Sequence, residues 1–107
     1  MHAMDQNKVL EAIGRYRIFF EAQNIPKADY PHDKFLNDEW IKIVDRPMSD
    51  VALAHCHGML NEMEEFVRQG RMEKVFRWLG FIQGCLWMAS SYRLEDLKNH
   101  NRPNLTG

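Results

Sequence analysis

Hydrophobic residues recur at helical spacing near the start of the chain. Between Asp5 and Gln23, steps of three and four residues place one apolar stripe along a helix, with polar residues at most other positions. The stripe consists of Val9, Leu10, Ile13, Tyr16, Phe19 and Phe20. Pro26 and Pro31 follow, and proline interrupts a helix because it cannot donate its backbone hydrogen bond. The pattern therefore predicts an amphipathic helix over residues 5–23 and then a connecting loop.

A shorter helix is predicted further along, ending before Pro47. Asp33 provides an N-cap acceptor, and Pro47 excludes helical geometry at Arg46. The apolar face of this helix is formed by Leu36, Trp40, Ile43 and Val44. A short strand over residues 40–44 is the alternative interpretation of the same pattern.

Two long helices are predicted on either side of Gly70, a residue type that commonly ends helices. Ser49 or Asp50 caps the first, residues 49–69, which has one apolar face. The second, residues 71–89, is apolar on nearly two faces, so we expect it at the centre of the fold or in an interface. The short connection predicts an antiparallel helical hairpin.

The C-terminal segment contains one more short helix. It begins at Ser90 or Ser91 and ends before Pro103, because proline cannot continue it. Its apolar positions are Leu94 and Leu97. Residues 104–107 are expected to fray.

The chain as a whole fits one domain. It has 107 residues, no internal repeat and no alternating pattern long enough for a sheet. Met1, His2 and Ala3 precede a second methionine and are interpreted as a vector or alternative-start segment. The sequence therefore predicts a single all-α domain, a small helical bundle built on the long hairpin with an N-terminal helix and short flanking helices.

Composition narrows the function classes and the expected compartment. The formal net charge of −1 lacks the excess of cations that sequence-independent nucleic-acid binding requires. No apolar stretch reaches the roughly 18 residues of a membrane span, and no secretory signal pattern occurs. Cys56 and Cys85 lie in apolar helical patterns without Cys-x-x-Cys spacing, so we expect both to be reduced. We expect a cytoplasmic protein that carries no cofactor.

His55, Cys56 and His57 form the one cluster of potential metal ligands. Successive helix positions point about 100° apart, so the three side chains cannot converge on one ion without breaking the helix. We therefore predict a core cysteine flanked by two partly exposed histidines, and no metal site. His32 or His100 would complete a site only if folding brought it near.

The charged residues of the long helices are interpreted as solvated faces. Glu64 and Arg68 are four residues apart, as in a helical ion pair, and Glu73 and Arg77 have the same spacing. Arg77 is also a candidate for binding a phosphate or a carboxylate, although ion pairing is the favoured interpretation.

Gly80 and Gly84 lie one turn apart in the most apolar helix, where each costs roughly 1 kcal/mol relative to alanine. They are predicted as a helix-contact site, within the chain or between subunits, because glycine lets another backbone approach. Gln83 can offer its amide to the same contact. Aromatic and arginine side chains nearby are typical of protein interfaces and also of nucleotide pockets. The predicted binding residues are Arg71, Arg77, Trp78, Phe81, Gln83, Trp87, Tyr92 and Arg93.

One stretch of the second half is distinctive. The segment Arg77-Trp78-Leu79-Gly80-Phe81-Ile82-Gln83-Gly84, followed by residues 94–103, resembles small uncharacterised proteins of tailed bacteriophages and prophages. The resemblance runs from about His55 onward and does not include residues 1–50. It implies a phage genomic setting and no particular mechanism.

The sequence contains no phosphate-binding glycine loop, nucleophile elbow, His-Glu-x-x-His motif or paired cysteine site, which disfavours an enzyme. Our main hypothesis is a non-catalytic, homo-oligomeric phage-type protein that modulates a host defence or metabolic protein through an apolar, aromatic helical surface. The alternative is an oligomer that sequesters a nucleotide-type signalling molecule between its subunits. A DNA-binding helical hairpin ranks last, because charges of both signs alternate on the two long helices.

Overall fold

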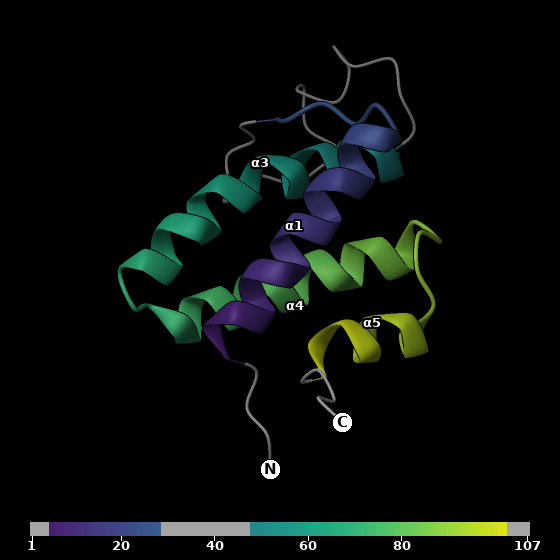
Figure 1. The fold of residues 1–107 in the computed structure, drawn as a ribbon. Coiled ribbons are helices and arrows are strands. Elements are labelled where there is room, and N and C mark those ends of the chain that lie inside the picture. The colour runs from purple at the N-terminus through teal and green to yellow at the C-terminus, as the bar shows by residue number, and fades with distance from the viewer. Residues whose placement is uncertain (1–4, 29–47, 103–107) are drawn as a thin grey trace.

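A computed structural model describes residues 5–28 and 48–102, which form four helices. These are α1 (Gln6–Ala22), α3 (Met48–Arg68), α4 (Met72–Met88) and α5 (Leu94–Asn101). The prediction of an all-α helical bundle is confirmed (Figure 1). The element predicted over residues 33–46 lies outside the described residues, as do residues 1–3 and 104–107.

Helix α1 begins and ends where the sequence predicts. The carboxylate of Asp5 accepts a hydrogen bond of 2.8 Å from the backbone N–H of Lys8, which satisfies one of the N–H groups left free at a helix start. After Ala22 the chain turns at Asn24, whose φ of 57° is left-handed and incompatible with further helix. The side chains that α1 buries are Val9, Ala12, Ile13, Tyr16 and Phe20, together with most of Lys8.

Helices α3 and α4 form the predicted antiparallel hairpin. Gly70 has a φ of 76°, a conformation that glycine adopts without steric cost. The N–H of Gly70 donates to the Val67 carbonyl at 3.0 Å and that of Arg71 to Phe66 at 2.9 Å, so the last carbonyls of α3 are satisfied. The predicted cap of α3 is wrong: the helix already begins at Met48, which places Asp50 inside its first turn.

The predicted start of the last helix is also wrong. Helix α5 begins at Leu94, and the carboxylate of Asp96 accepts a 3.1 Å hydrogen bond from the N–H of Arg93. Ser90 adopts a left-handed φ of 58°, so it belongs to the connection and cannot begin a right-handed helix.

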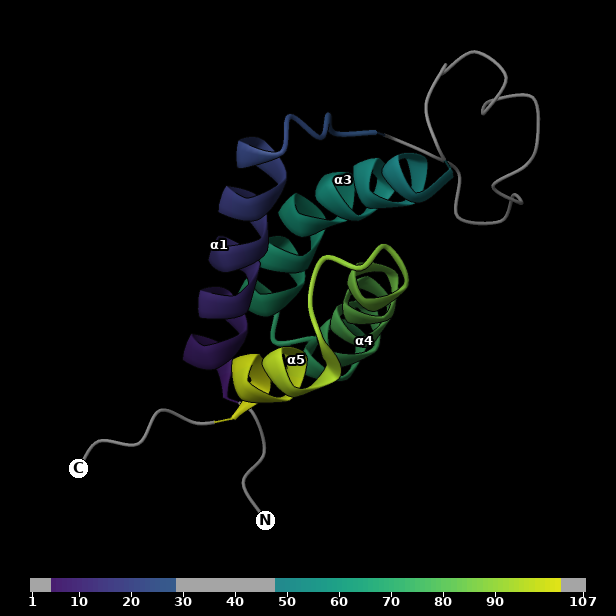
Figure 2. The same ribbon diagram turned by 90° about the vertical axis from the view of Figure 1, so that its right-hand side faces the viewer.

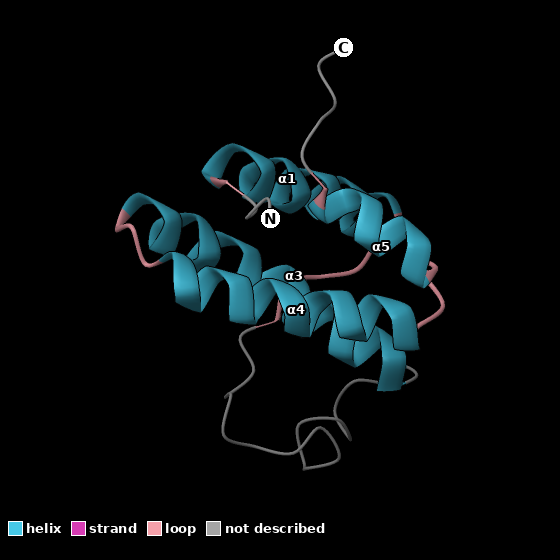
Figure 3. Ribbon diagram, turned by 90° about the horizontal axis from the view of Figure 1, so that it is seen from below, coloured by secondary structure: helices cyan, strands magenta, loops and turns pink. Residues whose placement is uncertain are grey.

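The four helices form two layers. The α3–α4 hairpin makes one layer, and α1 and α5 lie on the other side of it (Figure 3). Helix α1 crosses α3 and also contacts α5 (Figure 2). The core between the layers includes Ile13, Phe20, Leu60, Met63, Val75, Ile82 and Leu86, each less than 2% exposed. Among the described helices, none has both the length and the apolar character needed to cross a membrane.

The connection after α1 lies directly on α3. The N–H of Ala28 donates to the Ala54 carbonyl at 3.0 Å, and Nδ1 of His57 donates to the Ile25 carbonyl at 2.8 Å. Gly58 lies beneath this connection, and a Cβ there would clash with the carbonyl of Ala28. Glycine is therefore required at this crossing for steric reasons.

Helix α4 is not central, which corrects one of the two placements that the sequence predicts for it. It buries one face, formed by Val75, Leu79, Ile82, Gln83 and Leu86. Large apolar side chains on its other side remain exposed: Phe76, Phe81, Trp87 and Met88. The other expectation, that this helix lies in an interface, stays a prediction.

Candidate functional site

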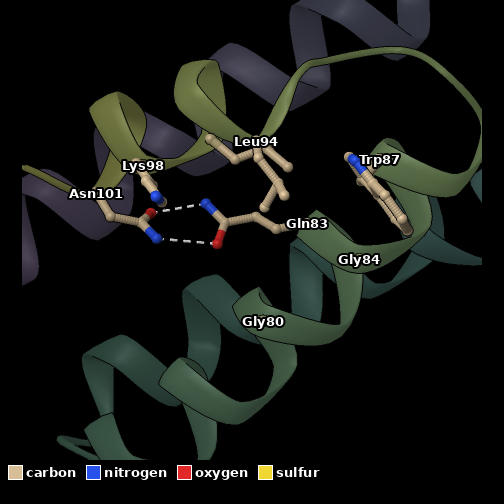
Figure 4. Close-up of a pocket in the computed structure, with 8 residues that line it drawn as sticks. Gly80, Gln83, Gly84, Trp87, Leu94, Lys98 and Asn101 are labelled. Carbon is tan, nitrogen blue, oxygen red and sulfur yellow. Dashed lines mark hydrogen bonds between the residues drawn. The ribbon is translucent and has the colours of Figure 1, made fainter.

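The outer side of α4 forms a groove with α5. The groove has a volume of about 370 Å³ and is lined by Gly80, Gln83, Gly84, Trp87, Leu94, Leu97, Lys98 and Asn101 (Figure 4). Each helix contributes four residues at spacings of i, i+3, i+4 and i+7, which is one continuous stripe of a helix surface. The groove is therefore the seam between two helix stripes, one of which carries two glycines.

Gly80 and Gly84 form the open part of this seam. Both are exposed, and a Cβ built on either meets no neighbouring atom within 4 Å. The helix contact predicted within the chain therefore does not occur at these glycines among the described residues. Their surface is accessible to the backbone of another molecule.

Large apolar side chains border the glycines. Trp87 is 52% exposed and Leu94 is 55% exposed, and both line the groove. Phe81 lies toward α3 instead, where its ring meets that of His55 edge to face with centroids 6.1 Å apart. Trp78 is half-buried and packs edge to face on Phe66, so it is not part of the groove. The groove thus unites Gln83, Trp87 and the two glycines, but not every aromatic residue that the sequence predicts.

The wall of the groove is a reciprocal pair of amides. Nε2 of Gln83 donates to Oδ1 of Asn101 at 2.6 Å, and Nδ2 of Asn101 donates to Oε1 of Gln83 at 3.0 Å (Figure 4). Nε2 of Gln83 also donates to the hydroxyl of Tyr16 at 3.0 Å. Gln83 is buried, so its amide joins three helices of the chain. It does not reach outward to a partner as the sequence suggests.

Behind the amide pair, the Tyr16 hydroxyl lies 2.7 Å from Nδ1 of His100. This hydroxyl accepts from Gln83, and it can donate its own proton to Nδ1 when the neutral imidazole carries its proton on Nε2. Burial raises the pKa of Tyr16 to about 12, although the hydrogen bond from Gln83 acts in the opposite direction. Burial also lowers the pKa of His100 below its ordinary value. The fold thus holds both groups neutral.

The predicted arginines do not gather at the groove. Arg77 is paired with Glu73 at 3.7 Å, which confirms the predicted ion pair. The guanidinium of Arg71 lies 4.9 Å from the centre of the Phe66 ring, near the hairpin turn. Arg93 lines a neighbouring hollow with Tyr92 and Trp87.

Charge at the groove comes from a residue that the sequence did not single out. Lys98 is the one charged side chain among the described residues that line it. Arg93, in the hollow beside it, is engaged with the carboxylate of Asp96 at 3.3 Å. A ligand of the groove therefore meets apolar surface with one ammonium group.

The His-Cys-His cluster does not form a metal centre in the described part of the chain, where no group of three potential ligands converges. Both histidines are buried, at 9% and 3% exposure for His55 and His57, so the prediction of partial exposure is wrong. They are covered because the ring of Phe81 lies against His55 and the chain after α1 crosses His57. Cys56 belongs to the hydrophobic core, as predicted.

The ion pair predicted within α3 is also wrong. Glu64 does not pair with Arg68; it accepts a hydrogen bond from Arg17 of α1, while Arg68 pairs with Glu65 at 2.7 Å. Packing of α1 on α3 brings Arg17 within reach. The pair therefore joins two helices rather than two turns of one helix.

The sequence interpretation missed half of the groove, namely Leu94, Leu97, Lys98 and Asn101, together with its supports Tyr16 and His100. A signal for the α5 residues exists, because they follow the same i, i+3, i+4, i+7 spacing as the α4 residues. No local pattern indicates that Tyr16 and His100, 84 residues apart, share a hydrogen bond.

Comparisons with known proteins return no relatives: no family model matches the chain, and neither the curated proteins nor the solved structures contain a significant match.

Proposed function

We propose that the protein is a non-catalytic, phage-type binding protein that modulates a host protein by taking one of its helices into the α4–α5 groove. The observation that carries the proposal is the pairing of two partly exposed helix stripes with glycines where side chains would otherwise fill the seam. Amphipathic helices bind such grooves through an apolar face. The phage setting rests on the resemblance of residues 77–84.

The dimensions of the groove fit this partner. A stripe from position i to i+7 covers about 10 Å of helix, which corresponds to two turns of a bound helix. Gly80 and Gly84 permit close backbone approach, and Trp87 offers a large, half-exposed indole. Tryptophan is among the residues that most often dominate binding energy at protein interfaces. We therefore expect Trp87 to be the main anchor.

Charge defines the partner further. Lys98 is the one cation that lines the groove among the described residues, and its neighbours there are uncharged. The partner helix should therefore carry a carboxylate at the edge of its apolar face, facing Lys98. A charge pair at the rim mainly adds specificity and association rate.

The test is capture from a bacterial host lysate, followed by titration of the captured protein after purification. Trp87→Ala removes the anchor, and Gly84→Leu fills the seam. Each should weaken binding by about 30-fold, the effect of losing roughly 2 kcal/mol at an interface hot spot. Lys98→Glu should weaken binding less and mainly slow association.

Ile18→Ala is the matched control, because Ile18 is an exposed apolar residue of α1, 72% accessible, outside the groove. This variant should bind like the wild type. Circular dichroism establishes that all variants remain folded. Equal binding by the groove variants, or equal loss with Ile18→Ala, would reject the groove as the binding site.

The same proteins test the nucleotide alternative. Saturating ligand at about 100 times its Kd stabilises a folded protein by roughly 2.7 kcal/mol, so a nucleotide library would raise the Tm of a sequestering protein. We expect no rise, because the arginines of one chain do not gather at the groove. A stoichiometric nucleotide with a raised Tm would instead support a pocket shared between subunits.

A further inference from the structure

The two cysteines lie opposite each other in the α3–α4 hairpin. Cys56 precedes Gly70 by 14 residues and Cys85 follows it by 15. At a rise of about 1.5 Å per residue, both lie a little over 20 Å from the turn, at the same level of the two antiparallel helices. These helices share the most extensive contact in the fold. The hairpin register therefore brings the two thiols to the same layer.

Both cysteines also face the hydrophobic core, where Cys85 packs against the buried cluster that contains Cys56. Interaction with the Cys85 thiol raises the pKa of Cys56, which burial raises further, and interaction with Cys56 lowers the pKa of Cys85. Cys56 is fully buried, whereas Cys85 is partly exposed. A reagent from solvent therefore meets Cys85 first, and this sulfur is the better nucleophile because more of it is thiolate.

We propose that Cys56 and Cys85 form an oxidation site at which a peroxide produces an intrachain disulfide that ties α3 to α4. The thiolate of Cys85 attacks one peroxide oxygen, the O–O bond breaks, and the products are a sulfenic acid and, after protonation, one water. The sulfur of Cys56 then attacks the sulfenic sulfur. Its proton leaves with the departing hydroxide as a second water, so two thiols are oxidised for each peroxide reduced.

The surroundings favour the bridge over further oxidation. The resolving thiol lies at the same level of the packed hairpin as the sulfur that becomes sulfenic acid, so we expect condensation to precede attack by a second peroxide. A disulfide requires Cα atoms within about 7 Å, a separation available to facing positions on packed helices. The closed loop contains the whole hairpin turn, which restricts the unfolded chain. The oxidised protein should therefore have a higher Tm than the reduced protein.

The experiment treats the reduced full chain with hydrogen peroxide, unfolds it in an alkylating reagent and measures its mass. The wild type should lose both alkylatable thiols together, remain a single chain, lose two hydrogen atoms and yield a peptide linking Cys56 to Cys85. Dithiothreitol should restore both thiols. In Cys56→Ser, Cys85 should form a sulfenic acid that dimedone traps, whereas Cys56 should stay reduced in Cys85→Ser.

Three results would overturn the proposal: sulfinic acid at Cys85 with Cys56 still alkylatable, disulfides between chains, or no reaction in the folded wild type. The wild-type measurement alone decides the matter if a serine variant does not fold. The site is independent of the proposed function, because partner binding is measured with the reduced protein and the groove variants.

Discussion

The two sides of α4 differ in composition and consequently in role. The inward side carries Leu86 and other aliphatic residues that are fully buried, with Gln83 as its polar exception. The outward side carries half-exposed aromatic residues and two glycines, at which a Cβ would meet no described neighbour. Burial contributes most to stability on the inward side, since removing apolar groups from water is favourable. The outward side is thus free to serve recognition at little cost to the fold.

The largest difference in the free energy of unfolding is expected between the variants Leu86→Ala and Met88→Ala. Leu86 is fully buried, so its truncation should lower the free energy of unfolding by about 2–5 kcal/mol. Met88 is 80% exposed, so its truncation should change stability by no more than about 0.5 kcal/mol. Urea unfolding monitored by circular dichroism measures both. A large loss with Met88→Ala would show that the outward side is covered in solution, for example by a second copy of the chain.

Gln83, the polar residue on the inward side of α4, should also stabilise the fold. Gln83→Leu removes both bonds to Asn101 and the bond to Tyr16, and should cost about 1–3 kcal/mol because buried partners lose their hydrogen bonds. Gln69→Leu is the control, since Gln69 is exposed and makes one 3.3 Å bond. Similar effects of the two changes would mean that the amide pair does not stabilise the fold.

The same contrast explains what the sequence could and could not predict. Some helix ends followed from local chemistry, such as the end of α3 at Gly70, where the structure agrees, whereas the predicted starts of α3 and α5 were wrong. The spacing of apolar residues in α4 also predicted that more than one face of this helix is apolar. The hydrogen-bond partners of polar side chains could not be predicted, because Gln83 and Glu64 bond to residues that only helix packing brings near. Spacing along one helix contains no information about a neighbour on another.

Gly58 and Gly84 differ in the space available for a side chain. Gly58→Ala places a methyl group against the backbone of Ala28, with the Ala28 carbonyl carbon only 3.2 Å away, and should cost about 1–3 kcal/mol. Gly84→Ala meets no neighbouring atom and should stabilise α4 by up to about 1 kcal/mol through helix propensity. Thermal and urea unfolding measure both effects. A destabilising Gly84→Ala would contradict an open groove.

Stability should also depend on pH, through two groups behind the groove. The pKa of His100 is lowered from 6.5, first by burial and then by Arg15, whereas Asp96 opposes the shift. Below 6.5 the unfolded chain therefore binds this proton before the folded chain does. Stability is complete above 6.5 and decreases as the pH falls through the lower, folded value. At the alkaline end, the raised pKa of Tyr16 makes stability decrease between 10.0 and about 12.

His100→Gln isolates the acid effect, because glutamine can accept the proton of the Tyr16 hydroxyl but does not titrate. As the pH decreases below 6.5, the free energy of unfolding should fall more in the wild type than in the variant. Tyr16→Phe should likewise flatten the alkaline decrease. Both measurements concern the inward network, so binding at the groove should depend on these protons only through the fold. If His100→Gln leaves the acid profile unchanged, the imidazole is not held neutral by its burial, and the network behind the groove titrates freely.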